Sequence, residues 1–204
     1  MTHLHSYIVA YDSGFAPNPF GGYCTLATCK PNIREYANIG DWVVGTGSND
    51  SKIKRGGHIV YAMKITEAVS FNCYWNDPRF QRKKPNLNSS YTKACGDNIY
   101  HQESDKTWFQ MDSYHSNKDG SANPSHVKRD TGVDRVLISD NYVYFGAEGP
   151  LLPEELQSSI VLKGRGRKKI SDETTISKFE KWLRELNLSG YQGKPYDMIK
   201  EAKK

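Results

Sequence analysis

The chain has 204 residues with 37% hydrophobic and 12% aromatic side chains, and its formal net charge is +5. This length is enough for one domain, or one domain with a small appendage, that buries a core without disulfide bonds or metals. The longest apolar runs, such as Ile59–Met63, are much shorter than the about 20 residues that a membrane helix needs. We therefore expect no membrane association, and the positive charge permits a polyanionic partner without requiring one.

The cysteines and the first residues of the chain bear on its compartment and on metals. Residues 1–5 lack the charged start and the apolar stretch of a signal peptide. The four cysteines, Cys24, Cys29, Cys73 and Cys95, have neither the density of a disulfide scaffold nor the spacing of paired zinc ligands. Glycine-rich phosphate motifs of standard spacing are missing from the sequence as well. We expect a cytoplasmic protein with unpaired cysteines, no metal and no cofactor.

Strand-like segments dominate the first three quarters of the sequence. In chain order they are residues 6–11, 40–48, 58–66, 98–100, 107–111, 135–139 and 142–146. Residues 23–29 fit a strand or a short helix, and Pro31 favours a helical turn to about residue 37. The last two strands are predicted to pair as a hairpin through Asp140-Asn141. The polar residues 116–132 are predicted to form a mobile loop.

Helices are predicted near the carboxyl end. One begins at Pro153 and runs to residue 161, and a second begins after Ser171 or Asp172 and ends at Gly190. The sequence shows no internal repeat, so we expect one hydrophobic core. The predicted domains are residues 1–162 and a basic linker with a C-terminal helix at residues 163–204, packed on the first domain or appended to it.

Five segments of the chain are similar to a known family. They are Asp12–Phe20, Cys24–Arg34, Gly40–Ser48, Gly96–Tyr100 and Ser139–Gly146. In these segments the chain resembles the second of the bacterial and phage families that are named nucleotide modification associated domains. The resemblance implies association with systems that modify bases, and it implies no particular reaction or catalytic residue.

A broader resemblance concerns the architecture. The strands at Gly40–Ser48 and His58–Thr66 and the element at Trp75–Pro78 are similar to the EVE domain and its YTH relatives, which have PUA-like folds. The likeness covers about residues 6–160. It implies an α+β fold with a curved, PUA-like β-barrel and C-terminal helices.

Polar and aromatic side chains in the predicted loops are candidates for a base-binding pocket. At the mouth of a small barrel, rings would sandwich a base while polar side chains read its edge. We predict a base- or nucleotide-binding site formed by Asp12, Phe15, Asn18, Phe20, Lys30, Arg34, Asp97 and Asn98. Tyr11, Trp42 and Trp75 are further ring candidates, although Trp42 is favoured as a core residue. The alternative for each Asp and Asn is a turn-forming role.

Two basic segments are predicted to hold phosphates. The first supplies Arg79, Arg82, Lys83 and Lys84, and the second, at residues 163–169, supplies Arg165, Arg167, Lys168 and Lys169. Such contacts depend on salt and do not read the base sequence. The alternative for either segment is a solvated loop.

These features predict a nucleic-acid-associated protein that recognises a modified nucleotide or base in bacterial or phage DNA-modification or defence systems. One alternative is an enzyme, a transferase or hydrolase of modified nucleotides or nucleobases, in which Asp12, Asp97 or Asp140 acts as acid, base or nucleophile. A third hypothesis is a module that binds proteins of a modification or defence system. A Ser–His–Asp triad can be assembled from the sequence only by free choice among many residues.

Overall fold

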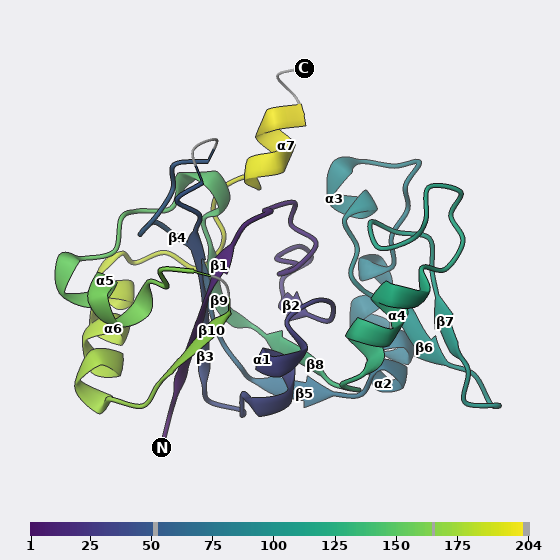
Figure 1. Cartoon of the computed structure of the whole chain (residues 1–204), viewed down its shortest axis with the longest axis horizontal. Helices are drawn as coiled ribbons and strands as arrows, with labels where there is room; N and C mark the ends of the chain where they lie inside the picture. Colours follow the sequence, from purple (N-terminus) through teal and green to yellow (C-terminus); the bar gives the residue numbers. More distant parts are fainter. Residues whose placement is uncertain (51–52, 165, 202–204) are drawn as a thin grey trace. The chain divides into compact units, whose positions relative to one another are not determined.

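The computed structural model describes residues 1–50, 53–164 and 166–201, and the chain divides into two compact units. We call unit 1 the part formed by Met1–Asp12, Ala37–Thr66 and Ser139–Lys204. Unit 2 is formed by Ser13–Tyr36 and Glu67–Ile138. The chain therefore leaves unit 1 and returns to it twice, as its colours show in Figure 1.

Unit 1 is built on a mixed six-stranded sheet. Its strands are, in spatial order, β10 (Arg167–Ile170), β1 (Leu4–Val9), β3 (Trp42–Gly47), β4 (Ile59–Lys64), β9 (Asn141–Tyr144) and β11 (Gly190–Tyr191). The pairs β1–β3 and β9–β11 are parallel, and the other pairs are antiparallel. Part of the basic segment at 163–169 forms strand β10, whose backbone pairs with β1 at the edge of the sheet.

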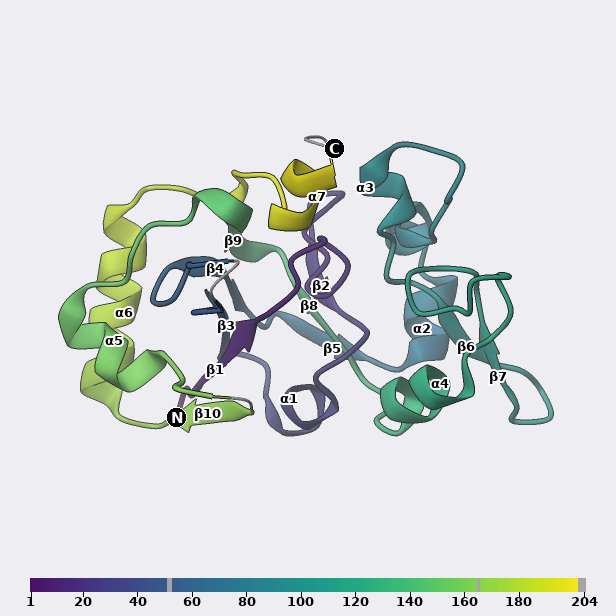
Figure 2. The ribbon, with the colours of Figure 1, turned by 45° about the horizontal axis from the view of Figure 1, so that its top comes forward.

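Two helices, α5 (Glu154–Ile160) and α6 (Glu173–Glu185), lie side by side along one face of this sheet (Figures 1 and 2). Helix α6 begins where the Asp172 carboxylate accepts a hydrogen bond from the Thr175 N–H at 2.8 Å, as the sequence predicts. Ile176 and Phe179 then point into the core, and Phe179 packs against Trp42 of β3 with ring centroids 5.7 Å apart. The remaining helices of unit 1 are the 3₁₀ turn η2 (Gly146–Glu148) and α7 (Tyr196–Glu201). The domain boundary at residue 162 stays a prediction.

Unit 2 has a smaller sheet and more helix. Its strands β2 (Cys24–Leu26), β8 (Val136–Ser139) and β5 (Glu67–Val69) form a three-stranded sheet, and β6 (Tyr100–Gln102) pairs with β7 (Trp108–Gln110). Its helices are α1 (Pro31–Tyr36), α2 (Phe71–Asn76), the 3₁₀ helix η1 (Pro78–Lys83), α3 (Tyr91–Ala94) and α4 (Pro124–Thr131). Figure 2 shows α2 and α4 beside the β6–β7 pair. Unit 2 has its own core, which includes Phe71, Tyr74, Phe80, Ile99 and Tyr100.

The α+β class predicted from the sequence is confirmed, but several finer predictions are wrong. Within the described residues no sheet closes into a barrel. Each unit has a hydrophobic cluster of its own in place of the single expected core. Helices are not confined to the carboxyl end, since α1 to α4 all precede residue 132. The predicted mobile loop contains α4, which Asn123 caps by accepting from the Ser125 and His126 N–H groups.

The predicted hairpin at residues 135–146 is also wrong. Strand β8 pairs with β5 in unit 2, and β9 pairs with β4 in unit 1. Both segments are buried and apolar, so their composition does not specify which strand is the partner. Ser139 anchors the change of direction, because its hydroxyl donates to the carbonyl of Lys64.

None of the helices described is both long and apolar enough to cross a membrane.

Asp12 ends the first segment of unit 1 and holds helix α7 in place. Its carboxylate accepts from the Tyr144 hydroxyl and, at 3.0 Å, from the Tyr196 N–H. The Asp197 N–H donates to the Asp12 carbonyl at 2.9 Å. Burial raises the pKa of Asp12 to about 6, although these two bonds to the carboxylate work against the rise. The ionised form of Asp12 therefore destabilises the folded protein near neutral pH.

We predict that Asp12→Asn stabilises the protein above pH 6. Because the folded pKa is raised above the ordinary value of 3.8, the folded state binds more protons than the unfolded state between these values, and its stability falls as pH rises. A pKa shift of this size lowers the free energy of unfolding of the wild type by about 3 kcal/mol at pH 8 and by almost nothing at pH 4. Urea unfolding at both pH values measures the difference, with the exposed Asp140→Asn as control. A variant that is equally destabilised at both pH values would show that the two hydrogen bonds outweigh the burial of charge.

Candidate active site

Cys29 lies at a turn between strand β2 and helix α1. Cys29 and Lys30 both have left-handed backbone conformations, with φ of 57° and 42°, which residues with a side chain rarely adopt. Pro31 then begins the helix, because its fixed φ suits the first helical position. The thiol of Cys29 is partly exposed at this strand–turn–helix connection, whereas Cys24 in the preceding strand is buried.

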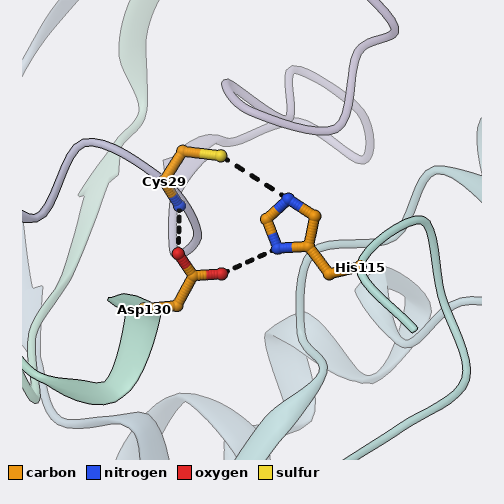
Figure 3. Close-up of side chains that lie close together, drawn as sticks. All are labelled: Cys29, His115 and Asp130. Atoms are coloured by element: carbon orange, nitrogen blue, oxygen red, sulfur yellow. Dashed lines mark hydrogen bonds and ion pairs between the residues drawn. The ribbon is translucent and has the colours of Figure 1, made fainter. Parts of the chain in front are cut away.

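The thiol of Cys29 faces His115, and His115 contacts Asp130 (Figure 3). Cys29 Sγ lies 3.6 Å from His115 Nε2, and His115 Nδ1 lies 2.7 Å from Asp130 Oδ2. The Cys29 N–H donates to the other carboxylate oxygen of Asp130 at 3.0 Å. A thiol, an imidazole and a carboxylate in this order are the nucleophile, base and orienting acid of cysteine enzymes. We call Cys29, His115 and Asp130 the triad.

The carboxylate of Asp130 fixes the tautomer of His115. It is fully buried and also accepts from the Tyr100 hydroxyl at 3.1 Å and from Arg129 Nε at 2.9 Å. Although burial opposes ionisation, the bonds from His115 and Arg129 lower the pKa of Asp130 to about 2. An ionised carboxylate can only accept, so Nδ1 of His115 carries the proton and Nε2 presents its lone pair to the Cys29 thiol. This is the tautomer that a general base requires.

The thiol and the imidazole are both neutral near neutral pH. Burial lowers the pKa of His115 despite the adjacent carboxylate, and the Arg129 guanidinium, 3.3 and 3.4 Å from the two ring nitrogens, lowers it further. Burial raises the pKa of the Cys29 thiol, and the charge of Asp130 adds to the rise. The resting pair is therefore thiol and imidazole, and the thiol loses its proton to His115 as it attacks a substrate.

Arg34 holds the turn that carries Cys29. Its guanidinium is fully buried and donates to the backbone carbonyls of Cys29 at 3.0 Å, Val133 at 2.7 Å, Arg135 at 2.7 Å and Asp130. Burial lowers the pKa of Arg34 to about 10, which leaves it charged at neutral pH. Arg34, predicted from the sequence to bind a base, thus joins the two backbone segments that supply Cys29 and Asp130.

The triad also offers atoms that metals bind. Among the described residues, Cys29, His115 and Asp130 form a group whose potential ligand atoms all lie within 4.8 Å of one another. The oxygens of Asp130 already accept from five donor atoms, and one of these is Nδ1 of His115. This leaves Cys29 Sγ and His115 Nε2, fewer than the three or four protein ligands of zinc sites. The arrangement therefore suits thiol chemistry better than metal binding.

Three of the residues predicted to bind a base are buried in unit 2. Asn18 donates to two backbone carbonyls at 3.1 and 2.7 Å, and Asn98 donates to two others at 3.1 and 3.2 Å. The carboxylate of Asp97 accepts from the hydroxyls of Thr25 and Tyr74, each at 2.7 Å. These contacts favour a structural role, because they use the groups that would otherwise read a base.

Lys83, predicted to bind phosphate, is buried as well. Only 2% of its surface is exposed, and its Nζ donates to Asn18 Oδ1 at 2.7 Å, Thr25 Oγ1 at 3.0 Å and the carbonyls of Asn18 and Tyr23 at 3.0 and 2.9 Å. Burial lowers the pKa of Lys83 to about 8. A phosphate in solvent does not reach this ammonium, and the geometry assigns Lys83 to the internal network.

The other predicted base-binding residues are divided between the two units. Phe15 is buried in unit 2 and packs against the ring of His115 with centroids 4.6 Å apart, so it helps to hold that ring in position. Lys30 is half-buried and follows Cys29 directly, and Phe20 is half-buried in the same unit. Asp12 belongs to unit 1, where it holds α7.

The last predicted catalytic acid, Asp140, and most of the cations predicted to bind phosphate lie at the surface. Asp140 is exposed. Arg79 is paired with Glu67 at 2.7 Å and Asp77 at 2.8 Å, and Lys84 Nζ lies 3.8 Å from the centre of the Trp75 ring. The other predicted phosphate ligands are Arg82 and Lys169, which are exposed, Arg167 and Lys168, which are half-buried in β10, and Arg165, which lies outside the described residues.

The triad is not predicted from the sequence. The spacing of Cys29 fits no zinc site, and His115 and Asp130 follow it by 86 and 101 residues with no local motif. One signal was present. Cys29 comes directly after a strand-like segment and just before Pro31, and a strand–turn–helix connection of this kind presents nucleophiles in other enzymes.

Comparison with known proteins shows the family of the chain. The family model described as nucleotide modification associated domain 2 matches residues 1–202. The chain belongs to this family. The match confirms the family resemblance predicted from the sequence. No curated protein and no solved structure matches the chain.

In this nucleotide modification associated domain 2 protein we predict that His115 titrates below its ordinary pKa of 6.5. Arg129→Gln removes a cation next to both ring nitrogens and should raise the pKa of His115. An NMR titration of the His115 ring, assigned with His115→Gln, measures both values, and Lys128→Gln on the same helix is the control. A wild-type pKa above 6.5 would mean that the Asp130 carboxylate outweighs burial and the Arg129 cation, contrary to the neutral imidazole inferred above.

A second prediction concerns Lys83. Lys83→Met keeps the length of the side chain but removes four hydrogen bonds from a charged donor inside unit 2, so the free energy of unfolding should fall by about 3–5 kcal/mol. Denaturant unfolding measures the loss, and the exposed neighbour Arg82→Met should change stability little. Unchanged stability together with weaker nucleic acid binding would instead support the phosphate role.

Proposed function

We propose that this protein is a cysteine-dependent enzyme of nucleotide modification, with Cys29 as nucleophile, His115 as general base and Asp130 as the group that orients His115. The observation that carries the proposal is the hydrogen-bonded path from Cys29 Sγ through His115 to Asp130. The nucleotide part of the proposal rests on the family match over residues 1–202. The enzyme class was the alternative prediction from the sequence, with other residues in the catalytic roles.

The chemistry that suits the triad is attack on an acyl carbon. His115 Nε2 takes the proton of the Cys29 thiol while sulfur forms a bond to a carbonyl carbon of an amide or ester carried by a nucleotide. The protonated His115 then gives the proton to the departing amine or alcohol, which leaves a thioester on Cys29. Water, deprotonated by His115, hydrolyses the thioester, releases a carboxylic acid and restores the thiol. Transfer to an amine in place of water gives the corresponding transferase.

Arg129 is suited to stabilise the charge that develops in this attack. Its Nη2 lies 4.0 Å from Cys29 Sγ, and its side chain is 41% exposed, so a substrate oxygen can approach it. A fixed cation next to the attacked carbonyl lowers the energy of the oxyanion. Arg129 also keeps the imidazole neutral, so that His115 can accept the thiol proton.

Recognition of a modified base without turnover is the second candidate. The family match favours a nucleotide-related partner, but Asn18, Asp97 and Asn98 are already bonded within unit 2. Other predictions from the sequence belong to this proposal. The protein would be cytoplasmic and distantly related to PUA-like domains. It would act on nucleic acid or modified nucleotides together with proteins of a bacterial or phage modification or defence system.

We predict that p-nitrophenyl acetate acylates Cys29 and that N-acetylated nucleosides are hydrolysed. Cys29→Ser should abolish both reactions, and His115→Asn should slow acylation by about 100-fold or more, since general base catalysis contributes at least that much. Mass spectrometry locates the acetyl group and chromatography follows the nucleoside. Cys73, which is exposed and has no part in the triad, is the internal control.

The result decides between the two candidates. Acylation of Cys73 and Cys29 at equal rates, unaffected by His115→Asn, would remove the catalytic role. Wild-type protein that binds N-acetylated nucleosides without hydrolysing them, with Cys29→Ser binding equally well, would favour recognition over catalysis.

A further inference from the structure

Unit 1 contains a cavity that the triad does not use. It lies beside helix α6 and strands β3, β4 and β9, and its volume is about 330 Å³. Ligand pockets in proteins have volumes of about 300–1,000 Å³, so this cavity can hold one small molecule. Its polar lining comes from Trp42, Lys64, Asn141, Glu180 and Arg184.

Glu180 is the acceptor in this cavity. Its Oε1 accepts from the Trp42 indole N–H at 2.8 Å and from Lys64 Nζ at 3.2 Å. Although burial opposes ionisation, these two bonds keep the pKa of Glu180 below its ordinary value, so the carboxylate is charged at neutral pH. Both bonds use Oε1, so within the described residues the two acceptor positions of Oε2 are open to a ligand. Glu180 can therefore accept two more hydrogen bonds from a ligand.

Two cations complete the cavity. The ammonium of Lys64 has three N–H donors and gives one to Glu180, so it can donate to a ligand oxygen beside the carboxylate. Arg184 follows Glu180 by one helical turn and is exposed, and no hydrogen bond of its guanidinium is found among the residues that the structure describes. With Glu180 these cations leave a net positive charge. The cavity thus favours an anion that offers two donors next to one acceptor.

We infer that this cavity binds a guanine nucleotide. The Watson–Crick edge of guanine has two adjacent N–H donors, at N1 and N2, beside the acceptor O6. Glu180 would accept both donors, Lys64 would donate to O6, and Arg184 would hold the phosphate. Adenine, cytosine and thymine each offer fewer donors on this edge. The inference does not depend on the triad, which lies in unit 2.

Calorimetric titration of the full chain with GMP, guanosine, IMP, AMP and inorganic phosphate tests this inference. GMP should bind most tightly, IMP at least about tenfold more weakly because it lacks the N2 amino group, and AMP and phosphate weakly or not at all. Glu180→Gln should abolish the preference for GMP over IMP, because the amide offers a donor where an acceptor is needed. Arg184→Ala should weaken GMP binding without changing the binding of guanosine. The matched control is Lys181→Ala, an exposed neighbour on the same helix that does not line the cavity.

Several outcomes would overturn the inference. Equal affinity for GMP and AMP would show that the cavity does not distinguish the two bases. Phosphate binding as tight as GMP binding would show that the cavity is only a surface anion site. GMP affinity unchanged in Arg184→Ala would place the nucleotide elsewhere. If Glu180→Gln fails to fold, the ranking of the nucleotides and Arg184→Ala still decide. Cys29→Ser should bind GMP like the wild type, so loss of the proposed catalysis and loss of this site are distinguishable.

Discussion

The carboxylate of Asp130 accepts hydrogen bonds from groups that are far apart in the sequence, and the geometry around Cys29 depends on it. It joins the turn at Cys29, the ring of His115 and the hydroxyl of Tyr100 to the end of helix α4. Hydrogen bonds to a charged group contribute more than neutral ones, and a buried charge that loses its partners is costly. The ionised state of Asp130 is therefore both a structural and a chemical requirement.

Arg34 is the buried cation of this site, and it binds backbone carbonyl groups. Its guanidinium binds the carbonyl oxygens of Cys29 and Asp130, so it ties the two backbone segments together in addition to the bond that the Asp130 carboxylate accepts from the Cys29 N–H. A lysine cannot replace it, because an ammonium lacks the planar fork that reaches several carbonyls at once. The left-handed turn at Cys29 is held by these contacts and not by local sequence preference.

Those parts of the fold that depend on neighbouring residues could be predicted from the sequence. Helix α6 has a capping Asp172 and apolar side chains at helical spacing, and both signals are local. The partners of β8 and β9 could not be predicted, because strand pairing joins residues that are distant in the chain and the two segments have the same apolar character. The same reason explains the missing barrel: closure depends on strand order, which composition does not encode.

The candidate site was harder to predict, because the sequence shows the chemistry of each side chain but does not show which side chains are buried. Asn18, Lys83 and Asp97 look like ligand-binding groups in polar loops, yet all three are buried. Lys83 donates to Asn18, and Asp97 accepts from Thr25. Conversely, Asp130 lies in the segment 116–132 that composition predicts as a loop, and His115 directly precedes it. Only tertiary structure brings them to Cys29.

The order in which the units use the chain has a consequence for synthesis on the ribosome. Unit 2 is complete once Ile138 has been made, whereas the sheet of unit 1 still lacks β9, β10 and β11 at that point. Strand β1 must therefore wait for β10, which is synthesised more than 150 residues later. Domains fold as units during synthesis, so unit 2 can fold while β1, β3 and β4 still expose the apolar face that α5 and α6 will cover. The unfinished sheet is the stage at which this protein is most exposed to aggregation.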